Sequence, residues 1–256
     1  MLIRPSECLQ NSKMAIEKLG AVSAPTLNEI IYKRLLQSIV TGKLLPGTPV
    51  TMSELARQLE VSLMPIREAL RKLEAQRLVI VGRNRRIVVG QLSASELSEM
   101  YRIRLKLETM AAKSAVMGVT DEGIREIEHA FSRMEMAENE EDFFEGNRAF
   151  HFSIYKAARM PVLLEFIETI WARISPYMHM YISVMLDYEA AAIFHKGMLE
   201  GIRSRDSKEV TRWLSCDLNR AARISLDRLK GRERSAGSEG SGVGHENGGS
   251  AGASTD

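Results

Sequence analysis

The chain has 256 residues, of which 45% are hydrophobic and 27% charged, and its formal net charge is +2. Because no run of about 18 apolar residues is present, the sequence predicts no membrane span, and the length suits one or two domains. Two cysteines, Cys8 and Cys216, support neither a disulfide framework nor a zinc knuckle. The first twenty residues lack a continuous apolar segment, so we expect a cytoplasmic protein.

After a polar segment, 1–25, which we expect to be a flexible arm, the segment 26–90 has the order of elements of a winged helix-turn-helix domain. A first helix is predicted by apolar residues at helical spacing, Leu27, Ile31, Leu35 and Ile39. A second helix is expected to begin at Thr51, which can form a capping box with Glu54. Glu60 and Val61 then form a tight turn, after which Ser62 is expected to cap a third helix.

The third helix and the hairpin that follows it are strongly basic on their exposed sides. Pro65 falls in the first turn of the helix, where a missing amide costs little. The apolar face of the helix is predicted to consist of Ile66, Ala69, Leu70 and Leu73. This leaves Arg67, Arg71 and Lys72 on the remaining surface. Two strands, Leu78 to Val81 and Ile87 to Val89, flank a hairpin tip that contains Arg83, Arg85 and Arg86.

The distribution of charge supports an interaction with DNA. Residues 27–90 contain eleven Lys or Arg and five Asp or Glu, a net charge of +6, whereas residues 91–230 contain nineteen and twenty-two, a net charge of −3. A basic hairpin tip alone is more often a solvated loop, and an amphipathic helix pair is ordinary protein core. Their joint occurrence in the positive segment predicts a DNA-binding head on an acidic body.

Two groups of motifs in the chain resemble a known family. The amphipathic helix followed by TGKLLPGTPVTMSELARQLEVS and MPIREALRKLEAQRLV resembles the DNA-binding head of the GntR superfamily of bacterial transcription regulators. IRLKLETMAAKSA, NRAFH and FHKGMLEGIRSRD are similar to the all-helical FCD effector domain of that superfamily. The match covers about Leu27 to Leu229. It implies a nucleoid-associated homodimer that binds double-stranded operator DNA, most often as a repressor, and responds to a small organic acid or sugar acid.

Two departures from the family pattern affect the expected DNA contacts. Family heads often carry arginine at the positions of Ser53 and Leu63 in this chain. Direct reading of bases therefore has to rest on the helix start and on the remaining cations. The expected DNA-binding residues are Ser62, Met64, Arg67, Arg71, Lys72, Arg83, Arg85 and Arg86.

The segment 91–230 is expected to be an all-α effector-binding and dimerisation domain, so the protein as a whole is predicted to be mainly α. About six helices are expected, at Ser93 to Met117, Asp121 to Ala137, Glu141 to Ala158, Val162 to Leu186, Glu189 to Arg205 and Ser207 to Lys230. Thr120, Pro161 and Asp206 supply caps or breaks. The segment 231–256 is rich in Gly and Ser and is expected to be disordered.

Four polar residues of the helical domain form a candidate metal site. Asn147 and His151 stand four residues apart and share a helix face, while His195 and Asp217 lie on the last two helices. The FCD pattern is Asp-x-x-x-His followed by two further histidines, so Asn147 and Asp217 replace two of the four ligands. Two imidazoles and a carboxylate still suit zinc, nickel, iron or manganese. The alternative is that both histidines are ordinary buried residues beside phenylalanines.

Arg104 is the candidate effector-binding residue, because family members place an inward arginine there and its planar guanidinium matches a carboxylate. The alternative is a structural pair with Glu108 on a solvated face. Tyr101 and Arg102 are not expected to point inward. Two other functions are compatible with these residues: a metal-dependent enzyme fused to a DNA-binding head, and an architectural DNA protein without sequence preference. Since no catalytic motif is present, a regulator rather than an enzyme is predicted.

Overall fold

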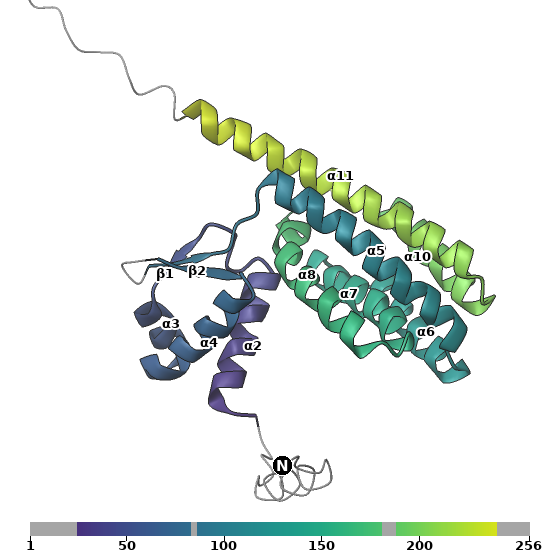
Figure 1. The fold of residues 1–256 in the computed structure, drawn as a ribbon, viewed down its shortest axis with the longest axis horizontal. Helices are drawn as coiled ribbons and strands as arrows, with labels where there is room; N and C mark the ends of the chain where they lie inside the picture. Colours follow the sequence, from purple (N-terminus) through teal and green to yellow (C-terminus); the bar gives the residue numbers. More distant parts are fainter. Residues whose placement is uncertain (1–24, 83–85, 181–187, 240–256) are drawn as a thin grey trace, which may run out of the picture.

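A computed structural model describes residues 25–82, 86–180 and 188–239. The head consists of helices α2 (Leu27–Val40), α3 (Met52–Leu59) and α4 (Leu63–Ala75) and strands β1 (Pro49–Val50), β2 (Val79–Val81) and β3 (Ile87–Val89). The strands form one antiparallel sheet in the order β1-β3-β2. This is a winged helix-turn-helix, with β2 and β3 as the wing (Figure 1). Strand β1 was not anticipated, because two residues are too few to show an alternating pattern.

Local sequence signals position the helix pair of the head. Thr51 forms the expected capping box with Glu54, and α3 ends at Glu60, whose φ of 55° is left-handed. That turn directs the chain into α4, whose apolar face is buried in the head core. Ser62 occupies the N-cap position of α4, but its side chain makes no capping hydrogen bond. The prediction that Ser62 caps the helix was therefore wrong, and its hydroxyl is exposed instead.

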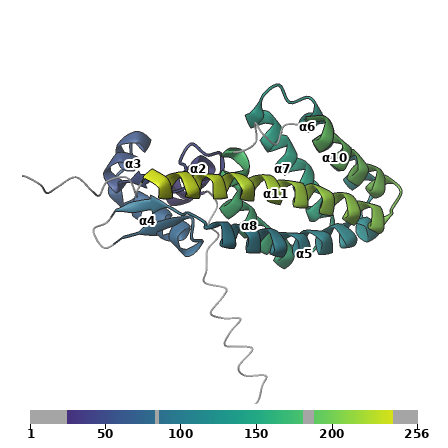
Figure 2. The same cartoon turned by 90° about the horizontal axis from the view of Figure 1, so that it is seen from above.

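The body, residues 91–239, contains six helices in its described part. They are α5 (Ala94–Gly118), α6 (Asp121–Glu135), α7 (Glu140–Ala157), α8 (Pro161–Met180), α10 (Tyr188–Arg203) and α11 (Ser207–Glu239). Helix α11 lies along α5 and α10, and α5 packs on α7 and α8 (Figures 1 and 2). Buried apolar side chains of these helices form one continuous core. No described helix is long and apolar enough to cross a bilayer.

The helix boundaries of the body follow the expected caps with two differences. Thr120 caps α6 through the amide of Gly123, Pro161 is the first residue of α8, and Asp206 accepts from the amides of two residues at the start of α11. Helix α8 is described only to Met180, so its expected extension to residue 186 lies outside the described residues. Helix α11 continues to Glu239, past the boundary expected at Lys230. Each of the two glycines in this extension, Gly231 and Gly237, costs a helix only about 1 kcal/mol, and the good helix formers Arg232, Glu233, Arg234 and Ala236 lie between them.

The head is joined to the body by packing as well as by the chain. Val40, at the end of α2, belongs to the body core, and Leu36 and Ala172 pack against both cores. The backbone amide of Leu92 donates to the hydroxyl of Tyr177 in α8. Two further links, Gln37 to Glu145 at 3.0 Å and Lys43 to Glu141 at 3.6 Å, lie at the surface of this junction.

Candidate functional site

The exposed start of α4 presents a mixed apolar and basic surface. Met64 is 62% exposed and Leu63 is 46% exposed, although both are apolar. Large apolar side chains on a helix N-terminus can contact thymine methyl groups in the major groove. The expected DNA-binding residues of this helix are all exposed, namely Ser62, Met64, Arg67, Arg71 and Lys72.

The cations of α4 differ in their surroundings. Arg67 and Arg71 line a hollow of about 320 Å³ between α4 and the wing, together with Val81 and Ile87. Arg71 also forms an ion pair of 2.9 Å with Glu68, which lies on the same helix. Lys72 lies over the ring of a tyrosine in α2, at 5.8 Å from its centroid. Arg67 has no carboxylate within 4.0 Å among the described residues, so it is the α4 cation with the least competition for DNA.

The wing is only partly described. Arg86 is exposed at the base of β3, as expected of a cation that contacts phosphates. Arg83 and Arg85 lie outside the described residues, so the prediction that they contact DNA stays a prediction.

Two histidines and an aspartate converge inside the body from three helices. His151 on α7 and His195 on α10 are both buried, and their Nε2 atoms are 3.3 Å apart. The carboxylate of Asp217 on α11 lies 3.4 Å from the first Nε2 and 3.9 Å from the second. One ligand atom from each residue can be chosen so that all three lie within 4.8 Å of one another. The arrangement brings together three of the four metal-ligand candidates, and Asn147 is buried one turn before His151.

A chain of buried hydrogen bonds orients the ring of His151. The hydroxyl of Tyr155 donates to Glu108, since that carboxylate can only accept. The Tyr155 oxygen therefore accepts from Nδ1 of His151, 3.1 Å away. A neutral His151 then has its proton on Nδ1 and a lone pair on Nε2, which is the form that binds metals. Tyr155 was missed from the sequence, although its position four residues after His151 places it on the same helix face.

Arg104 lies at the other end of this chain of hydrogen bonds. Its side chain is 1% exposed and its Nε donates to Glu108 at 2.6 Å. Trp171 donates to the same carboxylate at 3.0 Å, and its ring lies 4.5 Å from the guanidinium carbon. The expectation of an inward arginine was right, and the Arg104–Glu108 pair also exists, but it is buried rather than solvated. Tyr101, which was not expected to point inward, is buried.

The buried polar groups have shifted pKa values. Burial alone would raise the pKa of Asp217, but its neighbours His151, His195 and Arg104 lower it to about 2. Burial and the neighbouring Glu108 raise the pKa of Tyr155 well above its usual value. At neutral pH the cluster therefore contains an ionised Asp217 and a protonated Tyr155 hydroxyl.

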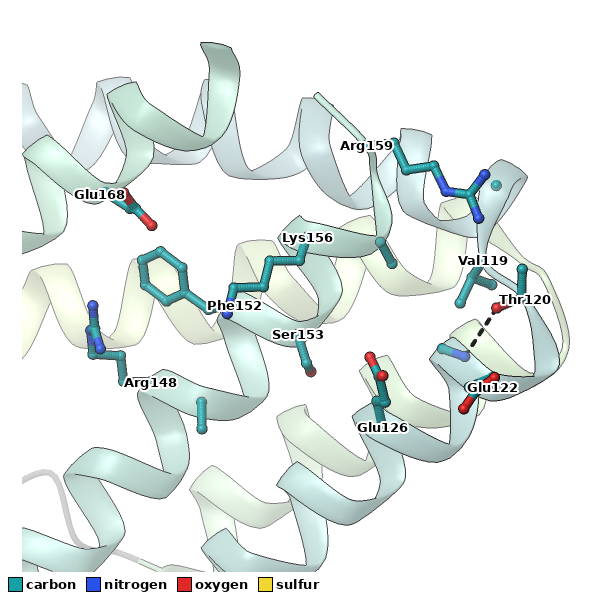
Figure 3. Close-up of a pocket in the computed structure, with 14 residues that line it drawn as sticks. Val119, Thr120, Glu122, Glu126, Arg148, Phe152, Ser153, Lys156, Arg159 and Glu168 are labelled. Carbon is teal, nitrogen blue, oxygen red and sulfur yellow. Dashed lines mark hydrogen bonds between the residues drawn. The ribbon is translucent and has the colours of Figure 1, made fainter. Parts of the chain in front are cut away.

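A second hollow, of about 620 Å³, opens between α6, α7 and α8 on a different face of α7 from the one that carries His151 (Figure 3). Phe152 and Ser153 lie on its α7 wall. Its charged lining is mixed in sign and was not anticipated from the sequence, namely Glu122, Glu126, Arg148, Lys156, Arg159 and Glu168.

The fold and the α4 surface define a winged-helix DNA-binding protein with an attached helical domain. Residues 27–89 match the gntR family of bacterial regulatory proteins, and residues 99–220 match the FCD domain. The chain belongs to the GntR family, in the branch with an FCD domain, and it is a DNA-binding transcription regulator with an effector domain.

Relatives and solved structures agree with this membership. The transcriptional regulator McbR of Escherichia coli K12 is 32% identical over 163 residues, which span 62% of this chain and 74% of McbR. The gluconate operon transcriptional repressor of Bacillus subtilis is 24% identical over 184 residues, 67% of this chain and 74% of the repressor. The solved structure of E. coli McbR/YncC superposes with a TM-score of 0.73 at 25% identity, covering 80% of this chain and 99% of McbR.

Proposed function

We propose that the protein is a repressor that reads its operator through the start of α4. The observation that carries this proposal is the exposure of Met64 and Arg67 beside the wing. The arginine is expected to bind a guanine through two hydrogen bonds. The Arg67→Ala variant should then lose about 1–3 kcal/mol, roughly 5-fold to 150-fold in affinity, and tolerate other bases at one operator position. An equal loss on all DNA sequences would assign Arg67 to a phosphate instead.

The proposed repressor acts as a homodimer, for which α5 offers a surface. Ile103, Met110 and Met117 recur every seven residues on α5 and are exposed. In an antiparallel pairing of two α5 helices, Glu99 of one copy would face Lys113 of the other. Exposed apolar stripes of this kind mark association surfaces.

Sedimentation tests the dimer. Met110→Asp should shift the protein from dimer to monomer at micromolar concentration, whereas Met136→Asp, at an exposed apolar residue outside the stripe, should leave the dimer intact. A dimer that survives Met110→Asp at every concentration would rule out α5 as the interface.

His151, His195 and Asp217 are proposed to hold a divalent metal ion. Nε2 of His151 lies 3.4 Å from the carboxylate of Asp217 and 3.3 Å from Nε2 of His195, so a cation could take the place of a proton among these three groups. Two imidazoles and a carboxylate form a facial set for zinc, nickel, iron or manganese. When bound, the ion would supply open positions for an oxygen of an effector, with Asn147 as a weak further donor.

Metal analysis of protein purified without added metal or chelator tests this site. One ion per chain is expected, and His151→Ala and His195→Ala should each remove it. His129→Ala, at an exposed histidine of α6, is the matched control. Stoichiometric metal that survives both substitutions would overturn the site.

The effector is proposed to be a small carboxylate or sugar acid. Arg104 is engaged by Glu108, so an acid reaches this arginine only by exchanging with that carboxylate. A thermal-shift panel of acetate, citrate and gluconate, followed by operator titration, tests the proposal. An acid that raises Tm and changes operator affinity supports it. Turnover of that acid by the full chain would favour the alternative, a metal-dependent enzyme.

A further inference from the structure

Helix α11 carries a row of cations on the side turned away from the body. Arg223, Lys230 and Arg234 are exposed, and their spacings of seven and four residues place them on one helix face. Ser225 and Leu229 are buried against the body on the opposite side. We call the three cations the α11 stripe.

Within the described residues, the charges of the α11 stripe form no ion pair. No carboxylate oxygen lies within 4.0 Å of their nitrogens in the part of the chain that the structure describes. Asp227 is the acidic residue on this face, and it leaves the stripe with a net charge of +2. Arg228 adds an exposed cation on a neighbouring face, and Arg232 adds another on the side of the helix turned toward the body. Such a surface attracts a polyanion.

Burial in the body does not account for the end of α11. Leu229 is the last buried side chain described in the helix, yet the helix continues for ten more residues to Glu239. Arg232 donates a weak hydrogen bond of 3.7 Å to the sulfur of Met180 in the body. The helix therefore carries cations beyond the part that packs on the core.

The end of α11 lies at the same end of the molecule as the DNA-binding head. In Figure 1, α4, the wing strands and the last turns of α11 follow one another along one edge. Figure 2, turned by 90°, also places the last turns of α11 at the end that carries α3 and α4. We consider a duplex whose major groove lies on α4 and whose neighbouring groove lies at the wing. If this duplex is lengthened past the wing, it approaches the α11 stripe.

We infer that the α11 stripe binds phosphates of the operator duplex beyond the segment that α4 and the wing contact. The inference rests on the DNA-binding function of the head and extends the interface to the end of the effector domain that lies beside the head. Phosphate contacts of this kind add affinity and fix orientation without reading sequence. They also make part of the operator affinity dependent on the body.

Salt-dependent binding to two duplexes tests the stripe. The short probe is the promoter DNA next to the chain's own gene, trimmed to the shortest duplex that retains sequence-specific binding. The long probe has about one helical turn more at each end. Each stripe engaged by the long probe should steepen the slope of log Kd against log salt by about 2.7, since each neutralised phosphate contributes about 0.9. Between 50 and 200 mM salt, this corresponds to about 40-fold more weakening.

The full-length triple variant Arg223→Gln, Lys230→Gln, Arg234→Gln should bind the short probe like the wild type and lose the additional slope on the long probe. The matched control is Arg125→Gln, Arg159→Gln, Lys208→Gln, which removes the same charge from exposed positions near the start of α6, just past the end of α7 and at the start of α11, away from the head. This control should keep the wild-type slope on both probes.

Three results would overturn the inference while leaving head binding intact. The first is equal slopes of wild type and triple variant on the long probe. The second is an equal loss in the control variant, which would indicate net charge alone. The third is unchanged DNA binding by the triple variant together with reduced binding to anionic lipid vesicles, which would assign the stripe to a membrane surface. Loss of specific binding to the short probe by Arg67→Ala is a separate result and tests the head.

Discussion

Replacing Glu108 tests whether the buried charge network supports the body. Glu108 is 0% exposed and accepts hydrogen bonds from Arg104, Tyr155 and Trp171. In Glu108→Ala the guanidinium of Arg104 would remain buried without its counter-charge, which costs about 3–5 kcal/mol. The loss of an acceptor for two neutral donors adds about 1–3 kcal/mol for each. Because such terms are not additive, we expect a loss of at least about 3 kcal/mol in the free energy of unfolding.

Urea unfolding followed by circular dichroism measures this loss. With a slope of about 3 kcal/mol/M, the midpoint of Glu108→Ala should fall by about 1 M or more. Glu209→Ala is the matched control, since Glu209 forms an exposed ion pair of 2.8 Å with Arg212 on α11. Exposed pairs contribute little to stability, so the control midpoint should stay at the wild-type value.

The double variant Arg104→Met, Glu108→Gln separates charge from hydrogen bonding. It removes both charges and leaves an amide oxygen for Tyr155 or Trp171. If the unpaired guanidinium dominates the loss, the double variant should be more stable than Glu108→Ala. The reasoning would be refuted by a Glu108→Ala midpoint equal to that of the control, or by a double variant no more stable than the single one.

Three further changes have defined outcomes. Thr51→Ala removes the cap of α3 and should cost about 1 kcal/mol, measured by urea unfolding; an unchanged midpoint would contradict the cap. Gly146→Ala would place a Cβ 2.7 Å from the Cα of Met134. The resulting overpacking should lower the free energy of unfolding by about 1–3 kcal/mol, measured as a fall in Tm; an unchanged Tm would contradict this close packing. Hydrogen bonds from the amide and hydroxyl of Ser93 lower the pKa of Glu96, so its contribution is present above pH ~4.5 and is lost as pH falls. Glu96→Gln should therefore flatten the acid limb of the stability profile, and an identical limb would exclude this contribution.

Local signals in the sequence were sufficient to predict most of the fold. The capping boxes at Thr51 and Ser93 and the helix start at Pro161 depend on residues within one turn, so a single sequence contains them. Ser62 has the right residue type at the right place, yet its hydroxyl does not cap. An exposed hydroxyl can form its hydrogen bond with water or DNA instead of with the backbone amide of the helix. The sequence pattern does not indicate which partner it takes.

The candidate site was less predictable because it depends on contacts between distant helices. His151, His195 and Asp217 were proposed together from spacing and family resemblance, and they converge in the fold. Spacing gives no information about burial, so the sequence left open whether Arg104 faces solvent. Its burial arises from α8, which supplies Trp171 more than sixty residues later.

The shared packing at the end of α2 limits how the protein can transmit a signal. Because Val40 belongs to the body core and Leu36 packs on both cores, a swivel of the head on its own body would expose apolar surface. The head and body of one chain should therefore move together as a rigid body. In the proposed homodimer, an effector would change the separation of the two recognition helices by tilting whole protomers. A pair of spin labels within one chain should then report a constant distance, while a pair placed across the proposed dimer should report a change.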